Sequence, residues 1–248
     1  RKSGKDSTNL KSFWLNYFEK KATLLLSKES HEINGFLDKK LVTTIRKKIR
    51  KLIKNQKHNL IFDFGCGDGS VTAPLVNENI NVIGIDISPK MCEIARQRGI
   101  KSIEADIDKY FAKNYLDLLI EYKNENSCLL FCESLGCSQN PIQTVQNISE
   151  SHDFAKTIII SLPNPKSLIR KSFNLLIKNK FTYFKIEDLD QKLVGLNFIR
   201  EKSYFVFCLP FIYSISIKSK KRKFLIAKIL KFLHTFLATN IIAVYKKP

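Results

Sequence analysis

The chain has 248 residues, of which 44% are hydrophobic and 26% are charged. This length and apolar content suffice for one full-sized domain with peripheral additions, or for two small domains, and they exclude a disordered tail, a collagen-like chain and a disulfide-stabilised miniprotein. The formal net charge of +19 points to an acidic partner, such as nucleic acid, an anionic membrane, or a phosphorylated or carboxylated substrate.

The positive charge lies in the two ends of the chain. Residues 1–59 carry a net charge of +11, residues 60–165 carry −6, and residues 166–248 carry +14. A uniform bias toward lysine would not leave an acidic middle between two basic flanks. The charge distribution therefore indicates different roles for the flanks and the middle.

Two helices are predicted before the first strand. Aromatic and apolar residues recur at helical spacing over residues 10–26, and apolar residues mark one face of a strongly basic helix over 35–55. We assign residues 1–58 to an N-terminal helical cap, with a loose polar terminus over 1–9. The single methionine is Met91, so we expect sequence to precede Arg1.

The middle of the chain alternates short β-rich runs with helical stretches. Strands are predicted at 59–64, 81–85, 101–104, 128–133 and 157–162, with helices near 70–78, 89–98, 109–123 and 141–149. This alternation is typical of parallel strands joined by crossover helices. It predicts an α/β fold with a Rossmann-like sheet.

After Pro163 the pattern changes. We predict a basic helical insertion at 166–178, a helix at 186–194, a strand at 198–208, a long helix at 219–237 and a last strand at 241–245. Residues 59–248 then form one domain, with cap insertions at about 166–183 and 209–240. No secretory signal and no apolar run of ~20 residues is visible, so we expect a cytoplasmic protein.

The most informative segment is Leu60-Ile-Phe-Asp-Phe-Gly-Cys-Gly-Asp-Gly-Ser70. An apolar run containing Asp63 is followed by three glycines at alternate positions, Gly65, Gly67 and Gly69, which open a helix. Glycines let the backbone approach a ligand closely, and a helix start offers unpaired N–H groups. The spacing differs from the dinucleotide fingerprint G-x-G-x-x-G, because Gly69 comes one place early.

Acids also follow the next two strands. Asp86 ends the second strand, where it can accept hydrogen bonds from ribose hydroxyls, and Asp106 follows the third, where it can accept from an exocyclic amine such as adenine N6. Ile87 and Ile107 are expected around the ring. One such acid alone would be an ordinary loop carboxylate, but acids at three successive strand ends beside a glycine loop favour a nucleoside-containing ligand.

With these motifs the sequence resembles the class I S-adenosylmethionine-dependent methyltransferases. D-F-G-C-G-D-G, G-I-D-I-S and E-A-D-I resemble their first three motifs, and 128–141, 159–165 and 186–198 resemble their later elements. The resemblance covers about residues 59–207. It implies a seven-stranded, mostly parallel sheet with an antiparallel last strand, and S-adenosyl-L-methionine as cofactor.

The resemblance also implies the site. The cofactor-binding residues would be Asp63, Gly65, Cys66, Gly67, Gly69, Asp86, Ile87, Asp106, Ile107 and Cys132. The glycines would line the methionine part, and Asp63 would orient the loop and the cofactor amino group. Asp86 would hold the ribose and Asp106 the adenine.

Candidate catalytic residues are fewer. Many small-molecule members of the family carry a His three residues after the acid that follows the fourth strand; counting from Glu133, that position holds Gly136. Glu133 and His152 are the remaining candidates, with His31 as an alternative base. Cys128, Cys132 and Cys137 lack zinc-ligand spacing, and we expect no metal.

The basic flanks allow more than one partner. Residues 218–237 have the pattern of an interfacial helix that contacts an anionic membrane, but a helix packed on the sheet with a solvated basic face is the favoured interpretation. Nucleic acid is less favoured, because neither an N-P-P-Y-like segment nor a Pro-Cys dipeptide follows the fourth strand. The sequence thus predicts a methyltransferase acting on O or N of a small anionic, sugar-like or lipidic substrate. The alternatives are an RNA methyltransferase using the basic flanks, and an inactive methyltransferase-like subunit.

Overall fold

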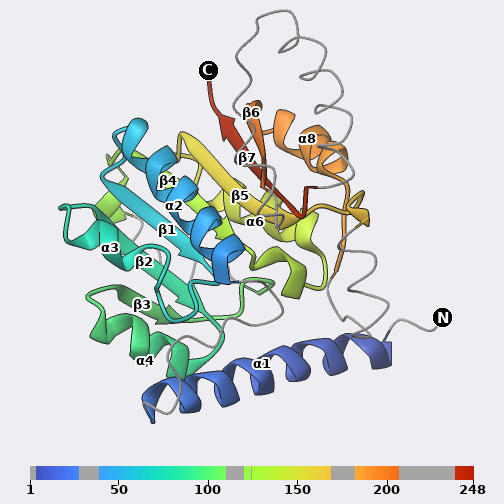
Figure 1. Cartoon of the computed structure of the whole chain (residues 1–248). Helices are drawn as coiled ribbons and strands as arrows, with labels where there is room; N and C mark the ends of the chain where they lie inside the picture. The colour runs from blue at the N-terminus through green and yellow to red at the C-terminus, as the bar shows by residue number, and fades with distance from the viewer. Residues whose placement is uncertain (1–3, 28–38, 110–119, 124, 169–181, 207–237) are drawn as a thin grey trace, which may run out of the picture.

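The fold is built on a seven-stranded sheet with the strand order β3-β2-β1-β4-β5-β7-β6 (Figure 1). The computed structural model describes residues 4–27, 39–109, 120–123, 125–168, 182–206 and 238–248. All neighbouring strands pair in parallel except β7, which is antiparallel to both β5 and β6. The predicted α/β fold and its antiparallel last strand are confirmed.

The elements follow the predicted order. The strands are β1 (Leu60–Phe64), β2 (Asn81–Asp86), β3 (Lys101–Glu104), β4 (Ser127–Cys132), β5 (Thr157–Pro163), β6 (Ile199–Val206) and β7 (Asn240–Lys246). The helices are α1 (Gly4–Leu26), α2 (Lys39–Asn55), α3 (Ala73–Val76), α4 (Pro89–Gln97), α6 (Pro141–Ser151), α8 (Ile186–Val194) and the short 3₁₀ helix η2 (Leu135–Cys137).

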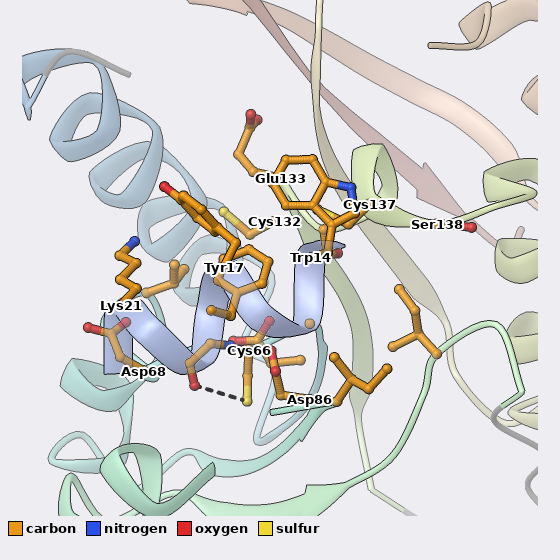
Figure 2. Close-up of a pocket in the computed structure, with 18 of the residues that line it drawn as sticks. Trp14, Tyr17, Lys21, Cys66, Asp68, Asp86, Cys132, Glu133, Cys137 and Ser138 are labelled. Carbon is orange, nitrogen blue, oxygen red and sulfur yellow. Dashed lines mark hydrogen bonds between the residues drawn. The ribbon is translucent and has the colours of Figure 1, made fainter. Parts of the chain in front are cut away.

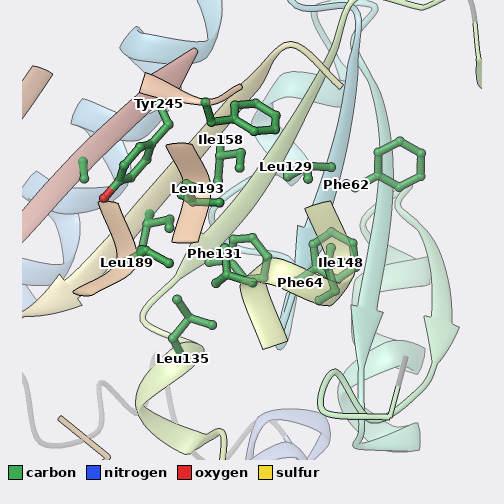
Figure 3. Packing of buried hydrophobic residues seen from close by; sticks show 14 of the residues in the cluster. Phe62, Phe64, Leu129, Phe131, Leu135, Ile148, Ile158, Leu189, Leu193 and Tyr245 are labelled. Carbon is green, nitrogen blue, oxygen red and sulfur yellow. The ribbon is translucent and has the colours of Figure 1, made fainter. Parts of the chain in front are cut away.

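Both faces of the sheet are covered, which explains why its central strands are almost continuously apolar. Phe62 and Phe64 of β1 lie in one apolar cluster with Phe131 and with residues of α6 and α8 (Figure 3). Ile61 faces the other way and packs with the apolar stripe of α2, formed by Leu41, Ile45, Ile49, Leu52 and Ile53. Successive side chains of β1 therefore pack alternately into the apolar clusters on the two faces of the sheet.

Helix α1 belongs to neither layer and lies along the edge at which the parallel strands end (Figure 1). Its Ala22 packs with Met91 and Ile94 of α4. Its Glu19 carboxylate accepts hydrogen bonds from the Ser88 hydroxyl at 2.5 Å and from the Lys90 N–H at 3.3 Å. These contacts anchor α1 at the start of α4, next to the loops that follow β1 and β2.

Some predicted elements differ from the structure. The helix expected at 70–78 is only the four residues of α3, because the Thr72 and Ala73 amides both bond to the Gly69 carbonyl in a tight turn. Most of the predicted 109–123 helix, the basic insertion from residue 169 onward and the 219–237 helix lie outside the described residues. Among the helices that the structure describes, none is long and apolar enough to cross a membrane.

Candidate functional site

A cavity of about 270 Å³ opens at the carboxyl ends of the strands (Figure 2). The loops after β1, β2, β3 and β4 form its floor, and α1 and α2 contribute its cover. This is the position at which parallel α/β sheets bind ligands. Nine of the ten predicted cofactor residues line it: Asp63, Gly65, Cys66, Gly67, Asp86, Ile87, Asp106, Ile107 and Cys132.

The loop after β1 is held by its neighbour strand. The amides of Gly65 and Cys66 both donate to the Ile85 carbonyl, at 2.7 and 3.1 Å. Gly65 and Gly67 have φ of +75° and +54°, in the left-handed region that favours glycine. A Cβ at Gly65 would lie 2.3 Å from the Ser134 side chain, whereas a Cβ at Gly67 would meet nothing within 4 Å. Gly67 therefore keeps its backbone open to the cavity.

Gly69 has a different role from the one expected. It does not line the cavity, and a Cβ there would lie 2.5 Å from the Ile100 side chain and 3.4 Å from Ala95 of α4. Its φ is +72°. Gly69 is therefore required for the turn and for close packing against α4. This placement differs from the prediction, in which Gly69 lined the methionine part of the ligand.

Asp63 is the most deeply buried acid of the site, with 1% of its surface exposed. Its Oδ2 accepts a hydrogen bond from the Thr72 hydroxyl at 2.8 Å, and its Oδ1 has no partner among the described residues. Burial raises the pKa of Asp63 to about 7, against the hydrogen bond from Thr72, which lowers it. A buried oxygen without a partner is costly, which indicates a ligand with a donor or a positive charge.

Asp86 connects the first two loops. Its Oδ2 accepts from the Gly67 amide at 2.8 Å and its Oδ1 from the Ser88 amide at 2.9 Å. Burial raises the pKa of Asp86, whereas these backbone hydrogen bonds lower it. The carboxylate thus fixes the glycine loop while facing the cavity.

Asp106 and Asp108 lie at the β3 side of the cavity. Asp106 pairs with Lys11 of α1 at 2.6 Å. Asp108 accepts hydrogen bonds from the hydroxyls of Ser138 and Thr144, at 2.5 and 2.7 Å, and from the Gln139 amide at 2.8 Å. The contact between Lys11 and Asp106 was not predicted, and it ties the helical cover to the expected adenine-binding acid.

The cover contributes aromatic side chains to the cavity. The sequence predicted the helix that carries them but not that they face a cavity. Trp14, Tyr17 and Phe18 of α1 line the cavity, with the Trp14 and Phe18 rings stacked at 5.9 Å between centroids. Trp14 is 4% exposed and is the only tryptophan of the chain. Helical spacing of aromatic residues was the available signal, but it does not tell which face meets a ligand.

Two cations on the β1 side were also not predicted. Lys21 of α1 and Arg46 of α2 line the cavity, and neither makes a hydrogen bond or ion pair with a described residue. Burial lowers the pKa of Lys21, with Asp68 opposing this effect and Arg46 adding to it. Asp68 itself pairs with Arg98 at 3.0 Å.

Glu133 lies directly after β4 with a φ of +59°, unusual for a residue with a side chain. Its Oε1 accepts hydrogen bonds from the Ser161 hydroxyl at 2.5 Å and from the Asn240 amide group at 2.8 Å. Ser161 and Asn240 belong to β5 and β7, so three strands determine the place of this carboxylate at the cavity wall. Strained backbone held by its surroundings is typical of functional positions.

His152 is not brought to the cavity. It is fully buried at the end of α6, with its ring 4.9 Å from that of Phe62 and 5.6 Å from that of Phe64, and its Nδ1 lies 2.8 Å from the Ile148 carbonyl. Burial lowers its pKa to about 4. This placement corrects the prediction of His152 as a base, because the ring belongs to the core. His31 lies outside the described residues.

Comparison with known sequences supports the glycine loop as the main signature. The family model for a methyltransferase domain matches residues 61–127. The uncharacterized methyltransferase C70.08c of Schizosaccharomyces pombe is 39% identical over 61 residues, which are 25% of this chain and 24% of that protein. The match thus spans about a quarter of the length of that relative.

Comparison with solved structures covers the whole fold. Magnesium protoporphyrin IX methyltransferase from Synechocystis PCC 6803, solved with bound SAH, has a TM-score of 0.62 at 15% identity and covers 96% of this chain and 100% of its own. A SAM-dependent methyltransferase from Archaeoglobus fulgidus has a TM-score of 0.60 at 18% identity, covering 83% of this chain and 94% of its own.

At these identities the structural matches establish the fold, and the family match covers the loops after β1, β2 and β3 that line the cavity. The glycine loop and the acids after β2 and β3 lie within the matched residues 61–127. The chain therefore has the Rossmann-like fold of these methyltransferases, and its residues 61–127 match the family model for a methyltransferase domain.

Proposed function

We propose that this chain binds S-adenosylmethionine in the cavity beneath α1 and transfers its methyl group to an oxygen or nitrogen atom of a small acceptor. The observation that carries the proposal is the convergence of Asp63, Asp86 and Asp106 with the Gly65–Gly67 loop on one cavity. These residues come from the ends of three neighbouring strands, and no requirement of the fold alone places three acids there.

The charges of the cavity fit this cofactor. S-adenosylmethionine carries a sulfonium, an ammonium and a carboxylate. The buried Oδ1 of Asp63, without a described partner, suits the ammonium group, and Arg46 or Lys21 suits the carboxylate. Asp86 would hold the ribose, and Asp106 with Ile87 and Ile107 the adenine.

The aromatic cover supports the same assignment. The faces of aromatic rings attract cations, most strongly where water is excluded. Trp14 and Tyr17 lie on the cavity side of α1 (Figure 2). They would surround a positively charged ligand and shield it from solvent.

Bound S-adenosylmethionine supplies a methyl group on a positively charged sulfur, ready for in-line displacement. The chain's own contribution is to align the acceptor with that group and to exclude water. Glu133, held rigidly by Ser161 and Asn240, is the carboxylate that we assign to the acceptor end of the cavity. There it would orient the acceptor or accept its proton, which a hydroxyl needs more than a neutral amine does.

Calorimetric titration of the intact protein tests the proposal. S-adenosylmethionine and S-adenosylhomocysteine should bind with one-to-one stoichiometry. ATP, which shares only the adenosine, should bind at least about a hundredfold more weakly, because it has no ammonium group to pair with the buried Asp63 carboxylate. Absence of binding to either sulfur compound would overturn the proposal.

A further inference from the structure

A second cleft, of about 490 Å³, lies beside the cofactor cavity. Its walls are the side of α2 and the segment from Ser70 to Asn77, with Arg98 at the end of α4 opposite. It shares two lining residues, Arg46 and Ser70, with the cofactor cavity. A ligand in this cleft therefore lies next to the cofactor site.

Three arginines line the cleft, and no acidic side chain does. Arg98 pairs with Asp68 at 3.0 Å, and Arg50 donates from Nη1 to the Val71 carbonyl at 3.1 Å. Arg46 makes no ion pair or hydrogen bond with any residue that the structure describes. The three guanidinium groups thus have one carboxylate between them.

The same side of α2 shows how this charge is compensated elsewhere. Arg46, Arg50 and Lys54 follow one another at intervals of four residues, so they share one side of the helix. Lys54, farthest from the cofactor cavity, pairs with Glu78 at 2.5 Å. Direct pairing decreases along the row: Lys54 has an ion pair and Arg50 a hydrogen bond to a carbonyl, with Glu78 acting on Arg50 only electrostatically. Arg46 has neither an ion pair nor a hydrogen bond with a described residue, and Asp68 attracts it electrostatically.

The uncompensated charge has a cost that a ligand could remove. Burial lowers the pKa of Arg50, and the neighbouring charge of Arg46 lowers it further, with Cys132 and Glu78 opposing this effect. An oxyanion between the guanidinium groups would remove this repulsion. Arginine binds phosphate oxygens through paired hydrogen bonds, and such charge-assisted bonds are among the strongest in proteins.

We propose that the cleft lined by Arg46, Arg50 and Arg98 binds a phosphate group, or an oxyanion of similar shape, carried by the methyl acceptor. That the ligand is the acceptor rests on the proposed function; that the cleft binds an oxyanion does not. The volume of the cleft is that of a small-molecule site, and Arg46 and Ser70 border both ligands. The acceptor is thus a small phosphorylated compound whose reactive atom reaches past Arg46 into the cofactor cavity.

The test is titration of the intact protein with inorganic phosphate and with pyrophosphate at constant ionic strength. Both should bind saturably, with pyrophosphate the tighter. Arg50→Gln and Arg98→Gln should each weaken binding about tenfold or more, since each removes a charged hydrogen-bond donor. Arg98 is 38% exposed, so Arg98→Gln should leave the fold intact. It therefore serves as the test if Arg50→Gln fails to fold.

Two matched variants control for general charge. Lys51→Gln removes one positive charge from α2, and Arg96→Gln removes one from α4, in each case at an exposed side chain that does not line the cleft. Both should bind phosphate within about twofold of the unchanged protein. Equal weakening in all four variants, or no saturable binding at all, would overturn the proposal.

Titrations with S-adenosylmethionine separate this proposal from the proposed function. Arg50→Gln and Arg98→Gln should bind the cofactor within about threefold of the unchanged protein, and saturating pyrophosphate should not displace it. If these variants lose cofactor affinity and keep phosphate affinity, the cleft serves the cofactor carboxylate and the proposal is wrong. Phosphate binding without any cofactor binding would overturn the proposed function and leave the oxyanion site standing. Displacement of pyrophosphate by a ten-nucleotide RNA at micromolar concentration would overturn the assignment to a small acceptor.

Discussion

The charged groups on the two sides of the cofactor cavity differ in whether they have partners within the protein. On the β3 side each acid has protein partners: Asp106 has Lys11, and Asp108 has two hydroxyls and an amide. On the β1 side, the buried Oδ1 of Asp63 accepts no hydrogen bond from a described residue, and the guanidinium of Arg46 makes no hydrogen bond or ion pair with one. On each side an acid near a strand end lines the cavity together with a cation from a covering helix, Asp106 with Lys11 of α1 and Asp63 with Arg46 of α2, so the strand positions alone do not impose the difference.

The difference separates polar groups that pair with other protein groups from polar groups that are left available to a ligand. Satisfied polar networks rigidify a site, whereas unsatisfied buried groups cost free energy until a ligand pairs with them. The β3 side therefore supplies a preformed wall with apolar contacts from Ile87 and Ile107. On the proposed function, the β1 side would supply the charges that distinguish S-adenosylmethionine from other adenosine compounds.

The largest expected effect comes from blocking the β1 side. Gly67→Arg places a long side chain at a position whose Cβ faces open space, and forces it into a φ of +54°. Cofactor affinity should fall more than about a hundredfold by calorimetry, because the side chain would occupy the ligand volume. Asp86→Ala, which removes the acceptor of the Gly67 amide, should have a comparable effect.

The control for backbone strain is Gly99→Ala. Gly99 also has a positive φ, of +85°, but it does not line the cavity. It should lower the free energy of unfolding by about 1 kcal/mol and leave cofactor affinity unchanged. Equal loss of affinity in Gly67→Arg and Gly99→Ala would mean that the loop matters only for folding.

Glu133 follows β4 and belongs to neither the β1 side nor the β3 side of the cavity. Replacing it tests whether a carboxylate with protein partners contributes to folding stability or to cofactor binding. Glu133→Ala should lower the free energy of unfolding by about 2 kcal/mol, because Ser161 and Asn240 lose their buried acceptor. Cofactor affinity should change less than about threefold. Chemical denaturation measures the first effect, with the exposed Glu150→Ala as control, and a large loss of cofactor affinity would assign Glu133 to the cofactor instead of the acceptor.

Asp63 predicts a pH dependence specific to the β1 side. Its pKa of about 7 means that the free protein must lose a proton before Asp63 can pair with the cofactor ammonium group. Affinity should rise up to about tenfold from pH 6 to pH 7.5, and then fall as the cofactor amine, with a pKa near 8, loses its own proton. Asp63→Asn should bind more weakly and lack the rising part of this profile. A profile identical to that of the unchanged protein would show that another group titrates.

The smallest effect is expected on the β3 side. The Lys11 side chain is 37% exposed, and pairs of this kind contribute little and are screened by salt. Lys11→Met should weaken cofactor binding about two- to threefold, because α1 loses one anchor. Raising the salt concentration from 0.05 to 0.5 M should lower the cofactor affinity of the unchanged protein by a similar factor and that of the variant hardly at all. A tenfold loss of affinity in Lys11→Met would contradict this and make α1 a main determinant of cofactor affinity.

The sequence predicted the sheet and the strand-end loops that line the cavity, because local patterns determine both. Asp63, Asp86 and Asp106 are placed by strand ends, and a strand end can be recognised from the apolar run before it. Gly69 was assigned to the ligand because alternating glycines look alike in sequence. Only the packing of Ile100 against it shows that its role is steric.

The cap and the catalytic residues could not be predicted in the same way. Whether Trp14 or Arg46 faces the cavity depends on how α1 and α2 dock on the sheet, which is a tertiary contact without a local signal. His152 was a candidate base because Gly136 stands where many family members carry a His. The aromatic rings of Phe62 and Phe64 instead surround His152 in the core and favour its neutral form.

The most direct test of the central claim uses the fluorescence of Trp14, the only tryptophan, which lines the cofactor cavity. Titration with S-adenosylmethionine should give a saturable change in its emission, which Gly67→Arg abolishes and Gly99→Ala preserves. An emission that does not change while the intact protein is saturated with S-adenosylmethionine, or that changes equally in Gly67→Arg, would contradict the account.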